Sequence, residues 1–226
     1  MPNQTVYTRE VRSTFWLVAL SAVCLLLAIG YLVFSANSSP AAYPAGVSSP
    51  DVKVLLTDDS GHGSGVHIGS GLILTAQHVV AGQAKMKVLT QGGVTAPAEI
   101  LWSNEHYDVA LIRIADYASV GVAPLDCTVP SVGTEITTFG NPQDLEFVLA
   151  TGHVAGTARR VGPWPEAIPV DITVAGGNSG GGVYDPEGHL VGIIVGGQAD
   201  MRSGGPTGFG AIVATPIICT MLGRNI

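Results

Sequence analysis

The chain has few basic residues and no cluster of them. Its 226 residues include 10 Lys and Arg against 17 Asp and Glu, which gives a formal net charge of -7 at pH 7. Proteins that bind nucleic acid usually gather Lys and Arg on one face, because the phosphates must be neutralised. The composition therefore argues against nucleic acid as a partner.

Patterns that hold metal ions are also missing. His62 and His67 are five residues apart in a glycine-rich stretch, but the HExxH pattern of many zinc sites does not occur there. Cysteine is scarce, with three residues in the whole chain. Cys24 lies in an apolar run, which leaves Cys127 and Cys219 as the only two in the rest of the sequence, an even number. We therefore expect neither a metal site nor another cofactor.

Helical periodicity is nearly absent after residue 50. Short runs rich in β-branched residues recur about every 8 to 12 residues and are separated by Gly and Pro clusters, which favours an all-β barrel or sandwich. One short helix is predicted at Pro216–Leu222, with Pro in its first turn and Gly223 after it. The predicted strands are 52–56, 65–67, 71–75, 85–89, 98–102, 109–114, 135–139, 147–153, 181–184, 190–195 and 208–213.

An uncharged apolar run near the N-terminus, residues 15–34, predicts a membrane-spanning helix. As a helix of about 20 residues it would be roughly 30 Å long, the thickness of a bilayer core. Arg9 and Arg12 precede it, and no Lys or Arg follows until Lys53. The positive-inside rule then places the N-terminus in the cytoplasm and the rest of the chain outside, in the periplasm or the extracellular space.

This interpretation divides the chain into four parts. They are a cytoplasmic segment at 1–13, a transmembrane helix at 14–35, a linker rich in Ser, Ala and Pro at 36–50, and an exported domain at 51–226. The alternative is a signal peptide cleaved near Ala36, which would release the domain as a secreted protein. The apolar core of a signal peptide is usually shorter, about 7 to 15 residues, and so the retained helix is the preferred prediction.

Three segments hold residue types that together activate a serine for attack. Ser179 lies in GGNSGGGV, His78 in LTAQHVV, and Asp108 precedes the apolar run VALIRI. Each has an ordinary interpretation when taken alone: a Gly/Ser turn, a structural histidine and a strand-end cap. In the order His, Asp, Ser they are the base, the orienting carboxylate and the hydroxyl of a nucleophilic hydrolase.

The sequence resembles the trypsin-like serine peptidases of the chymotrypsin fold, and within them the HtrA/Deg type. The resemblance extends from about Val52 to Leu222, and the segments that carry it are GSGVHIGSGLILTAQHVV, YDVALIRI, VGTEITTFGNP and DITVAGGNSGGGVYDPEGHLVGIIVGG. It implies two six-stranded antiparallel β-barrels, about 51–122 and 123–215, followed by the short C-terminal helix. The implied function is a serine endopeptidase that acts on proteins or peptides, and the predicted transmembrane helix would tether it to the membrane.

The resemblance also implies a role for each site residue. His78 takes the proton of Ser179, Asp108 orients His78, and the amides of Gly177 and Ser179 form the oxyanion hole. The pocket for the residue before the scissile bond is formed by uncharged positions, namely Thr173, Gly197 and Gly208. We therefore expect small or medium apolar residues to be preferred there and basic ones to be poor.

A bridge between Cys127 and Cys219 is a further implication, because relatives of trypsin join the segment between the barrels to the C-terminal helix in this way. The sequence departs from many secreted relatives at Asn178, where they have an Asp that pairs with a newly formed N-terminus. Activation by N-terminal cleavage is therefore not expected. HtrA proteins usually carry a PDZ domain after the protease domain; the printed sequence has no counterpart, and we expect no regulation by such a domain.

Two other functions are compatible with parts of the sequence. A trypsin-like module could have lost activity and serve in binding, although such a module would not need all three of the residues named above. An α/β-hydrolase esterase could use Ser179, Asp185 and His189, but that fold requires alternating helices and parallel strands, which this sequence lacks.

Overall fold

The computed structural model describes Cys24 and residues 48–57, 61–199 and 205–223. The segment predicted as a transmembrane helix lies outside this part of the chain, apart from Cys24, and so do 1–13 and most of the predicted linker. Among the residues that are described, no helix combines the length and the apolar character needed to cross a bilayer.

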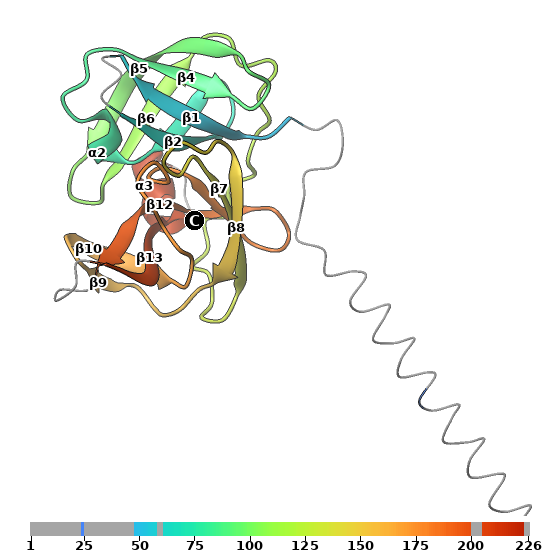
Figure 1. The fold of residues 1–226 in the computed structure, drawn as a ribbon, viewed down its shortest axis with the longest axis vertical. Helices are drawn as coiled ribbons and strands as arrows, with labels where there is room; N and C mark the ends of the chain where they lie inside the picture. The colour runs from blue at the N-terminus through green and yellow to red at the C-terminus, as the bar shows by residue number, and fades with distance from the viewer. Residues whose placement is uncertain (1–23, 25–47, 58–60, 200–204, 224–226) are drawn as a thin grey trace, which may run out of the picture. The chain divides into compact units, whose positions relative to one another are not determined.

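The first half of the domain is a closed barrel of six antiparallel strands (Figure 1). Its strand order is β1-β2-β3-β6-β5-β4. Strands that follow each other in the sequence pair, except β3 and β4. Instead, β3 pairs with β6, and β1 pairs with β4 to close the barrel. Apolar side chains from alternate positions fill the interior. The strands are β1 (Asp51–Leu56), β2 (His62–His67), β3 (Leu72–Thr75), β4 (Met86–Thr90), β5 (Thr95–Asn104) and β6 (Val109–Ile114).

The second half is a seven-stranded sheet with the order β8-β7-β11-β12-β13-β10-β9. The prediction of six strands in this half was wrong, because β9 adds a seventh strand at one edge of the sheet. The other edge approaches β10 only through an isolated bridge between Val154 and Val170. The strands are β7 (Glu135–Gly140), β8 (Val148–His153), β9 (Arg159–Val161), β10 (Trp164–Val170), β11 (Gly182–Tyr184), β12 (Leu190–Ala199) and β13 (Pro206–Ala214).

The strands β9 and β10 were not predicted from the sequence. The segment holds Pro163, Pro165 and Pro169, and proline interrupts the alternation and cannot donate to a strand ladder. The structure accommodates Pro163 in the turn between β9 and β10, and Pro165 where the pairing of these two strands is irregular, between Trp164 and Ala167.

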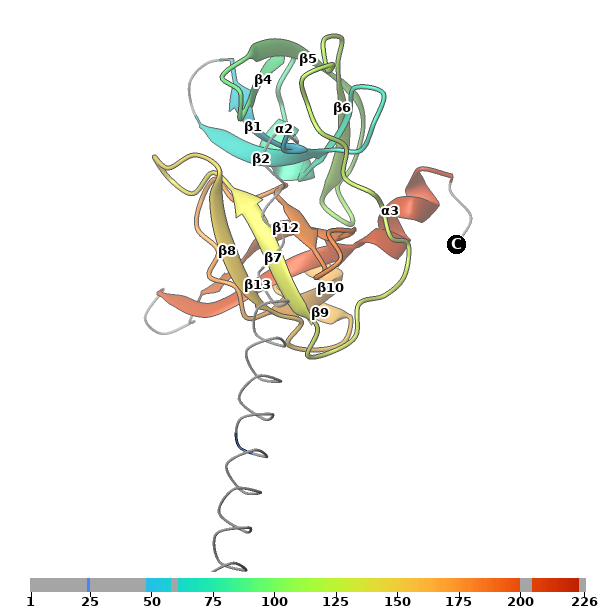
Figure 2. The ribbon, with the colours of Figure 1, turned by 90° about the vertical axis from the view of Figure 1, so that its right-hand side faces the viewer.

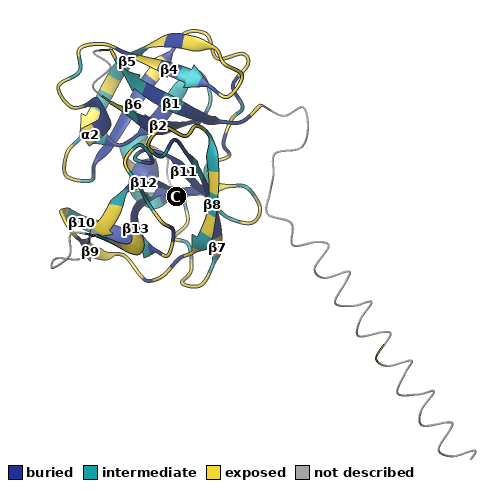
Figure 3. Ribbon diagram, viewed as in Figure 1, coloured by how far each residue is buried: buried dark blue, intermediate teal, exposed yellow. Residues whose placement is uncertain are grey.

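The buried apolar side chains form three groups, one of which joins the two halves. One fills the barrel, one fills the second sheet, and the third contains residues of both halves, such as Leu74 and Val109 with Leu190 and Val213. Figure 3 shows the strands that face this interior as mostly buried and the connecting loops as mostly exposed. The two halves therefore share a continuous core rather than touching through a polar surface.

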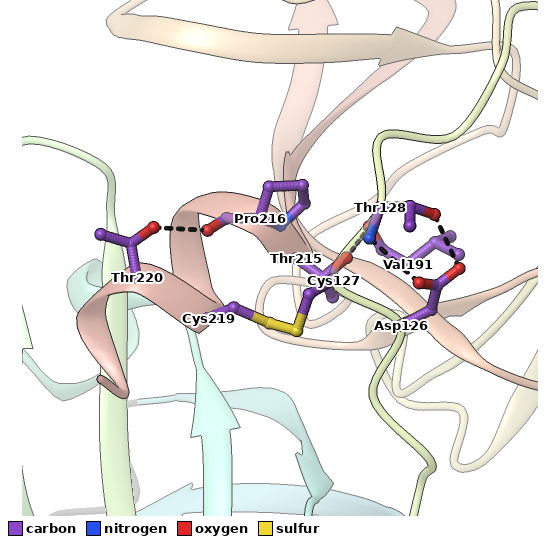
Figure 4. Close-up of a disulfide and its surroundings, with 8 residues drawn as sticks. All are labelled: Asp126, Cys127, Thr128, Val191, Thr215, Pro216, Cys219 and Thr220. Carbon is purple, nitrogen blue, oxygen red and sulfur yellow. Dashed lines mark hydrogen bonds between the residues drawn. A yellow bond between two sulfur atoms is a disulfide. The ribbon is translucent and has the colours of Figure 1, made fainter. Parts of the chain in front are cut away.

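The helix α3 (Thr215–Met221) follows β13 and carries Pro in its first turn, as the sequence predicts. It lies beside the chain that runs from the barrel to the second sheet (Figure 2). A disulfide joins Cys219 of α3 to Cys127 of that connection, with 6.0 Å between the two Cα atoms, as the resemblance implies (Figure 4).

Candidate active site

His78 lies on a single helical turn, α2 (Gln77–Val80), which directly follows β3. Val79 and Val80 are buried in the barrel core, and they fix the turn while the side chain of His78 remains 48% exposed. The strand predicted at 71–75 places His78 just after a strand end, and the structure shows that a helical turn begins there. The turn directs the imidazole out of the barrel.

Asp108 accepts hydrogen bonds from three donors although it is almost buried, at 6% exposure. His78 donates from its backbone N to Oδ1 over 2.9 Å, and its Nδ1 lies 2.8 Å from Oδ2. The third donor is the indole Nε1 of Trp164, 2.9 Å from Oδ2. Because an ionised carboxylate only accepts, Nδ1 of His78 carries the proton and Nε2 is left free to accept one.

Asp108 has a φ of 59°, which is unusual for a residue other than glycine. Asp tolerates this left-handed region better than most residues. The residue after it begins β6, so the carboxylate is held where the chain turns into the strand. A strand-end position was expected from the sequence, whereas the left-handed conformation was not.

Ser179 lies in the loop between β10 and β11, between two glycines that have positive φ, Gly177 at 97° and Gly180 at 88°. A side chain on Gly177 would collide with the carbonyl of Asn141, and one on Gly180 would collide with the carbonyl of Ser64. The dense glycine around the serine is therefore required by both the backbone conformation and the close packing of the loop.

The peptide between Gly176 and Gly177 is held in one orientation. Gln143 N donates to the Gly176 carbonyl over 2.7 Å, and Ser64 Oγ donates to the Gly177 carbonyl over 2.7 Å. In a planar trans peptide the N–H of Gly177 points away from the Gly176 carbonyl. Within the described part of the chain, neither this N–H nor that of Ser179 has a hydrogen-bond acceptor. Two donors close to the serine are thus available to a ligand.

A cleft of about 620 Å³ contains both His78 and Ser179. No hydrogen bond joins these two side chains in the described structure. The cleft also brings in residues that the sequence did not single out for this site, among them Trp164 and Glu105. Its complete lining is Gln77, His78, Glu105, His106, Asp108, Pro163, Trp164, Ser179, Val195, Gly196 and Gly197.

The three positions predicted for the substrate pocket are not all in this cleft. Gly197 is part of its lining, whereas Thr173 and Gly208 are exposed and lie outside it. Val174, next to Thr173, packs close to both Gly197 and Gly210. The structure therefore brings one of the three predicted positions together with Ser179.

The other histidines have separate partners. His67 is buried, with Nδ1 2.6 Å from the Gly121 carbonyl and Nε2 accepting from Gly71 N, and so it is structural. His62 Nε2 lies 2.8 Å from the Asn141 carbonyl. In the part of the chain that the structure describes, no group of three His, Cys, Asp or Glu side chains could hold a metal ion.

Asp185 and His189 do not form the esterase site considered above. They lie in the turn between β11 and β12, with His189 Nδ1 3.4 Å from Asp185 Oδ2, and neither lines the cleft around Ser179. In the described residues the sheets are built from antiparallel strand pairs, without the alternating helices and parallel strands of that fold.

Trp164 is the residue of the site that sequence reasoning missed. It is separated from Asp108 by 56 positions, and it lies in the proline-rich segment that was not predicted to form strands. A tryptophan directly after a Gly-Pro turn was the only local signal, and it does not identify a partner.

A His–Asp pair and a glycine-bordered serine in one cleft, carried by a β-barrel and a second β-sheet, define a site of the trypsin-like class. The family model for the trypsin-like peptidase domain matches residues 63–193, more than half of the chain, and the chain belongs to this family. Within the family, the chain is similar to HtrA-type proteases.

Two curated relatives and one solved structure illustrate this similarity. Serine protease Do-like HtrA of Bacillus subtilis is 30% identical over 182 residues, which cover 74% of this chain and 39% of the relative. A probable periplasmic serine protease do/HhoA-like of Haemophilus influenzae is 31% identical over 140 residues, 59% of this chain and 30% of the relative. The HtrA-type protease AlgW with tripeptide has a TM-score of 0.70 and 25% identity, over 78% of this chain and 60% of that one. The chain thus spans less than half the length of these two curated relatives.

Proposed function

We propose that this protein is a serine endopeptidase in which Ser179 is the nucleophile, His78 the general base and Asp108 the residue that orients His78. The observation that carries the proposal is the shared cleft, where a histidine already bound to a buried carboxylate lies with a serine whose own N–H and that of Gly177 are unpaired in the described structure. The named proteases among its relatives support the same activity.

In the proposed mechanism, Ser179 Oγ attacks the carbonyl carbon of the scissile bond while Nε2 of His78 takes the hydroxyl proton. The tetrahedral intermediate collapses when His78 returns that proton to the leaving amine, which gives an acyl-enzyme and the first product. Water, activated by His78, then releases the second product and restores the serine. Asp108 stays ionised throughout and stabilises the imidazolium.

The negative oxygen of the intermediate is proposed to be bound by the N–H groups of Gly177 and Ser179. Supporting this assignment, the Gly176 carbonyl is held away by Gln143, so the N–H on the other side of the same peptide is free. Donors that are already oriented stabilise the developing charge without a reorganisation cost.

Protein or peptide substrates are proposed from the relatives, one of which is described as holding a tripeptide. For the residue before the scissile bond, Gly197, which lines the cleft, is the proposed wall of the pocket; the other two positions, Thr173 and Gly208, lie outside the cleft, and none of the three carries a charge. A basic side chain would lose its hydration there without gaining a partner. We therefore propose a preference for small or medium apolar residues.

An exported location is also part of the proposal. One relative is named as periplasmic, which fits the positively charged segment before residues 15–34 of this chain. In the proposed topology, residues 14–35 are a membrane anchor, residues 36–50 a linker, and the protease domain lies in the periplasm or outside the cell.

Covalent labelling with a fluorophosphonate probe, together with hydrolysis of a peptide library, tests the function. The unaltered chain should be labelled, and Ser179→Ala should abolish labelling and lower peptide hydrolysis by a factor on the order of 10⁴ or more. His78→Ala and Asp108→Asn should also reduce turnover severely. Ser103→Ala, at an exposed serine of β5 outside the cleft, is the matched control and should behave like the unaltered chain.

Labelling that persists in Ser179→Ala would refute the nucleophile. Absence of both labelling and hydrolysis in the unaltered chain would instead favour the binding-module alternative. In the library profile, a dominant cleavage after Arg or Lys would refute the proposed pocket.

A further inference from the structure

The Asp108 carboxylate is shared between the two halves of the domain. Two of its three donors, the backbone N–H and Nδ1, belong to His78, which lies on the barrel beside Asp108 itself. The third comes from Trp164, the first residue of β10 in the second sheet. The bond from Trp164 therefore crosses from the half that carries Ser179 to the half that carries the His–Asp pair.

The position of the indole is closely determined by its surroundings. Gly162, with a φ of 56°, and Pro163 form the turn before it, and the ring packs over Gly196 of β12. Even a single methyl group on Gly196 would collide with this ring. Trp164 is half-buried, and its ring lines the same cleft as His78 and Ser179. The ring thus has little freedom to leave Asp108.

Hydrogen-bond donors on more than one side hold a buried carboxylate in one rotamer. Without the indole, Oδ2 would keep only the bond from Nδ1 of His78, and Asp108 would rotate more freely with the imidazole. The N–H of Trp164 also withdraws part of the negative charge from the His78 side of the carboxylate. The indole therefore affects both the orientation of His78 and the electrostatic field at its ring.

We propose that Trp164 is a positioning residue for catalysis: its indole N–H fixes the Asp108 carboxylate, and through it His78, in register with Ser179 on the other half of the domain. This inference rests on the proposed function, since positioning matters for a rate only if these residues catalyse a reaction. Trp164 does not need to touch the reacting atoms in order to act in this way.

Replacing the indole N–H while keeping an aromatic ring separates positioning from simple packing. Trp164→Phe should lower kcat for a peptide substrate by about 10- to 100-fold, the effect of losing one hydrogen bond to a charged group. KM should change by less than about threefold, because a ring still covers Gly196 and lines the cleft. The acidic limb of the pH profile of kcat/KM should move to higher pH, since the carboxylate would act more strongly on the imidazole.

Trp102→Phe is the matched control for exchanging a tryptophan for phenylalanine. Trp102 is a half-buried residue of β5 that packs against the core; it lies outside the cleft, and its indole forms no hydrogen bond in the described structure. The substitution Trp102→Phe should leave kcat, KM and the pH profile unchanged. Equal kcat and equal pH profiles in Trp164→Phe and the unaltered chain would overturn the inference. A change in KM alone would also overturn it, because it would show that Trp164 only lines the cleft.

A second variant answers the possibility that Trp164→Phe fails to fold. Incorporation of 3-benzothienylalanine at position 164 keeps the bicyclic ring and replaces N–H by sulfur, which cannot donate. The readout is the downfield proton resonance of the His78 Nδ1–H, assigned by its loss in His78→Ala. We expect the analogue to shift or broaden this resonance, and an unchanged resonance would overturn the inference.

This resonance does not depend on turnover, so the two proposals can fail separately. A shifted resonance in the analogue, in a protein that neither hydrolyses peptides nor reacts with the fluorophosphonate probe, would support the contact and refute the proposed function. If the enzyme is active and neither the His78 resonance nor kcat changes when the indole N–H of Trp164 is removed, the proposed function is supported and the role of Trp164 is refuted.

Discussion

At the scale of single residues, the loop around Ser179 depends on glycine for two separate reasons. Gly177 must adopt a φ of 97°, and it must also approach the Asn141 carbonyl more closely than any side chain permits. The neighbouring peptide is then held by hydrogen bonds from Gln143 and Ser64. The conformation of this loop is therefore set by the groups around it, which leaves the Gly177 N–H unpaired within the described structure.

A second residue-scale feature is the pair formed by Asp171 and His153. The backbone N–H of His153 donates to Asp171 Oδ1, and this bond is the main reason why the pKa of Asp171 lies below its ordinary value of 3.8. The imidazole of His153 lies 3.3 Å from Oδ2 and acts in the same direction. Both side chains are about half exposed, so solvent weakens the interaction.

Asp171→Asn should lower the free energy of unfolding at neutral pH by less than about 1 kcal/mol. Because the pKa is lower in the folded protein, ionised Asp171 stabilises the fold above pH 3.8, and the contribution disappears as the pH falls through the folded pKa. Urea unfolding at pH 7 and at increasingly acidic pH should show the two chains converging in acid. Asp116→Asn, at an exposed site without a hydrogen bond in the described structure, should show no such pH dependence; a difference for Asp171→Asn that stayed constant down to about pH 2 would contradict the assignment.

At the scale of elements, α3 depends on its attachment to the rest of the fold. It has seven residues, and a helix of this length is not stable by itself in water. Ile218 and Cys219 are fully buried, and the disulfide connects the helix to residue 127 across a sequence separation of 92. Packing and the covalent bond together hold this helix against the connection between the two halves.

Removing the disulfide should destabilise the protein by an amount on the order of 4 kcal/mol, since the unfolded chain would regain the freedom that a long closed loop removes. The comparison is between Cys127→Ala/Cys219→Ala and the unaltered pair, both in a Cys24→Ser background so that no free thiol interferes. Urea unfolding without reductant measures the difference. A reducing agent should lower the stability of the unaltered pair only, and equal sensitivity of both proteins to reductant would show that the bond is not the cause.

At the scale of the whole molecule, a buried polar contact connects the two halves in addition to the shared core. Tyr184 of β11 donates its hydroxyl to Asp51 of β1 over 2.6 Å, and both residues are nearly inaccessible to solvent. A carboxylate in such a place requires donors, because water cannot reach it. The contact therefore adds a directional polar interaction to the apolar packing between the two halves.

Tyr184→Phe should lower the free energy of unfolding by about 1–3 kcal/mol, because it removes one donor from a buried carboxylate. Urea unfolding followed by tryptophan fluorescence gives the measurement. Tyr117→Phe provides the control, since Tyr117 is 41% exposed and its hydroxyl has no hydrogen bond in the described structure; it should change stability by less than about 0.5 kcal/mol. Equal effects of the two substitutions would show that the contact with Asp51 adds nothing.

Most strands of the barrel could be predicted because their signals are local. The runs 52–56 and 109–114 have the length and apolar character of buried strands, and the structure forms strands almost at those boundaries. The prediction failed for segment 159–170 because its prolines break that pattern; its two strands form through the pairing of β10 with β13 and with β9. The strand number of the second sheet was wrong for the same reason.

The site shows the same division between local and long-range information. Sequence alone determined the β class, the helix at the C-terminus, the family resemblance and the positions of the histidine, carboxylate and serine, because strand alternation, glycine and proline act within a few residues. Only the tertiary structure decided that Trp164 bonds to Asp108, that Gly177 and Ser179 have unpaired amides in the described chain, and that Tyr184 reaches Asp51. These contacts join residues distant in the chain, and their geometry depends on how the barrel packs against the second sheet, which no short stretch of sequence encodes.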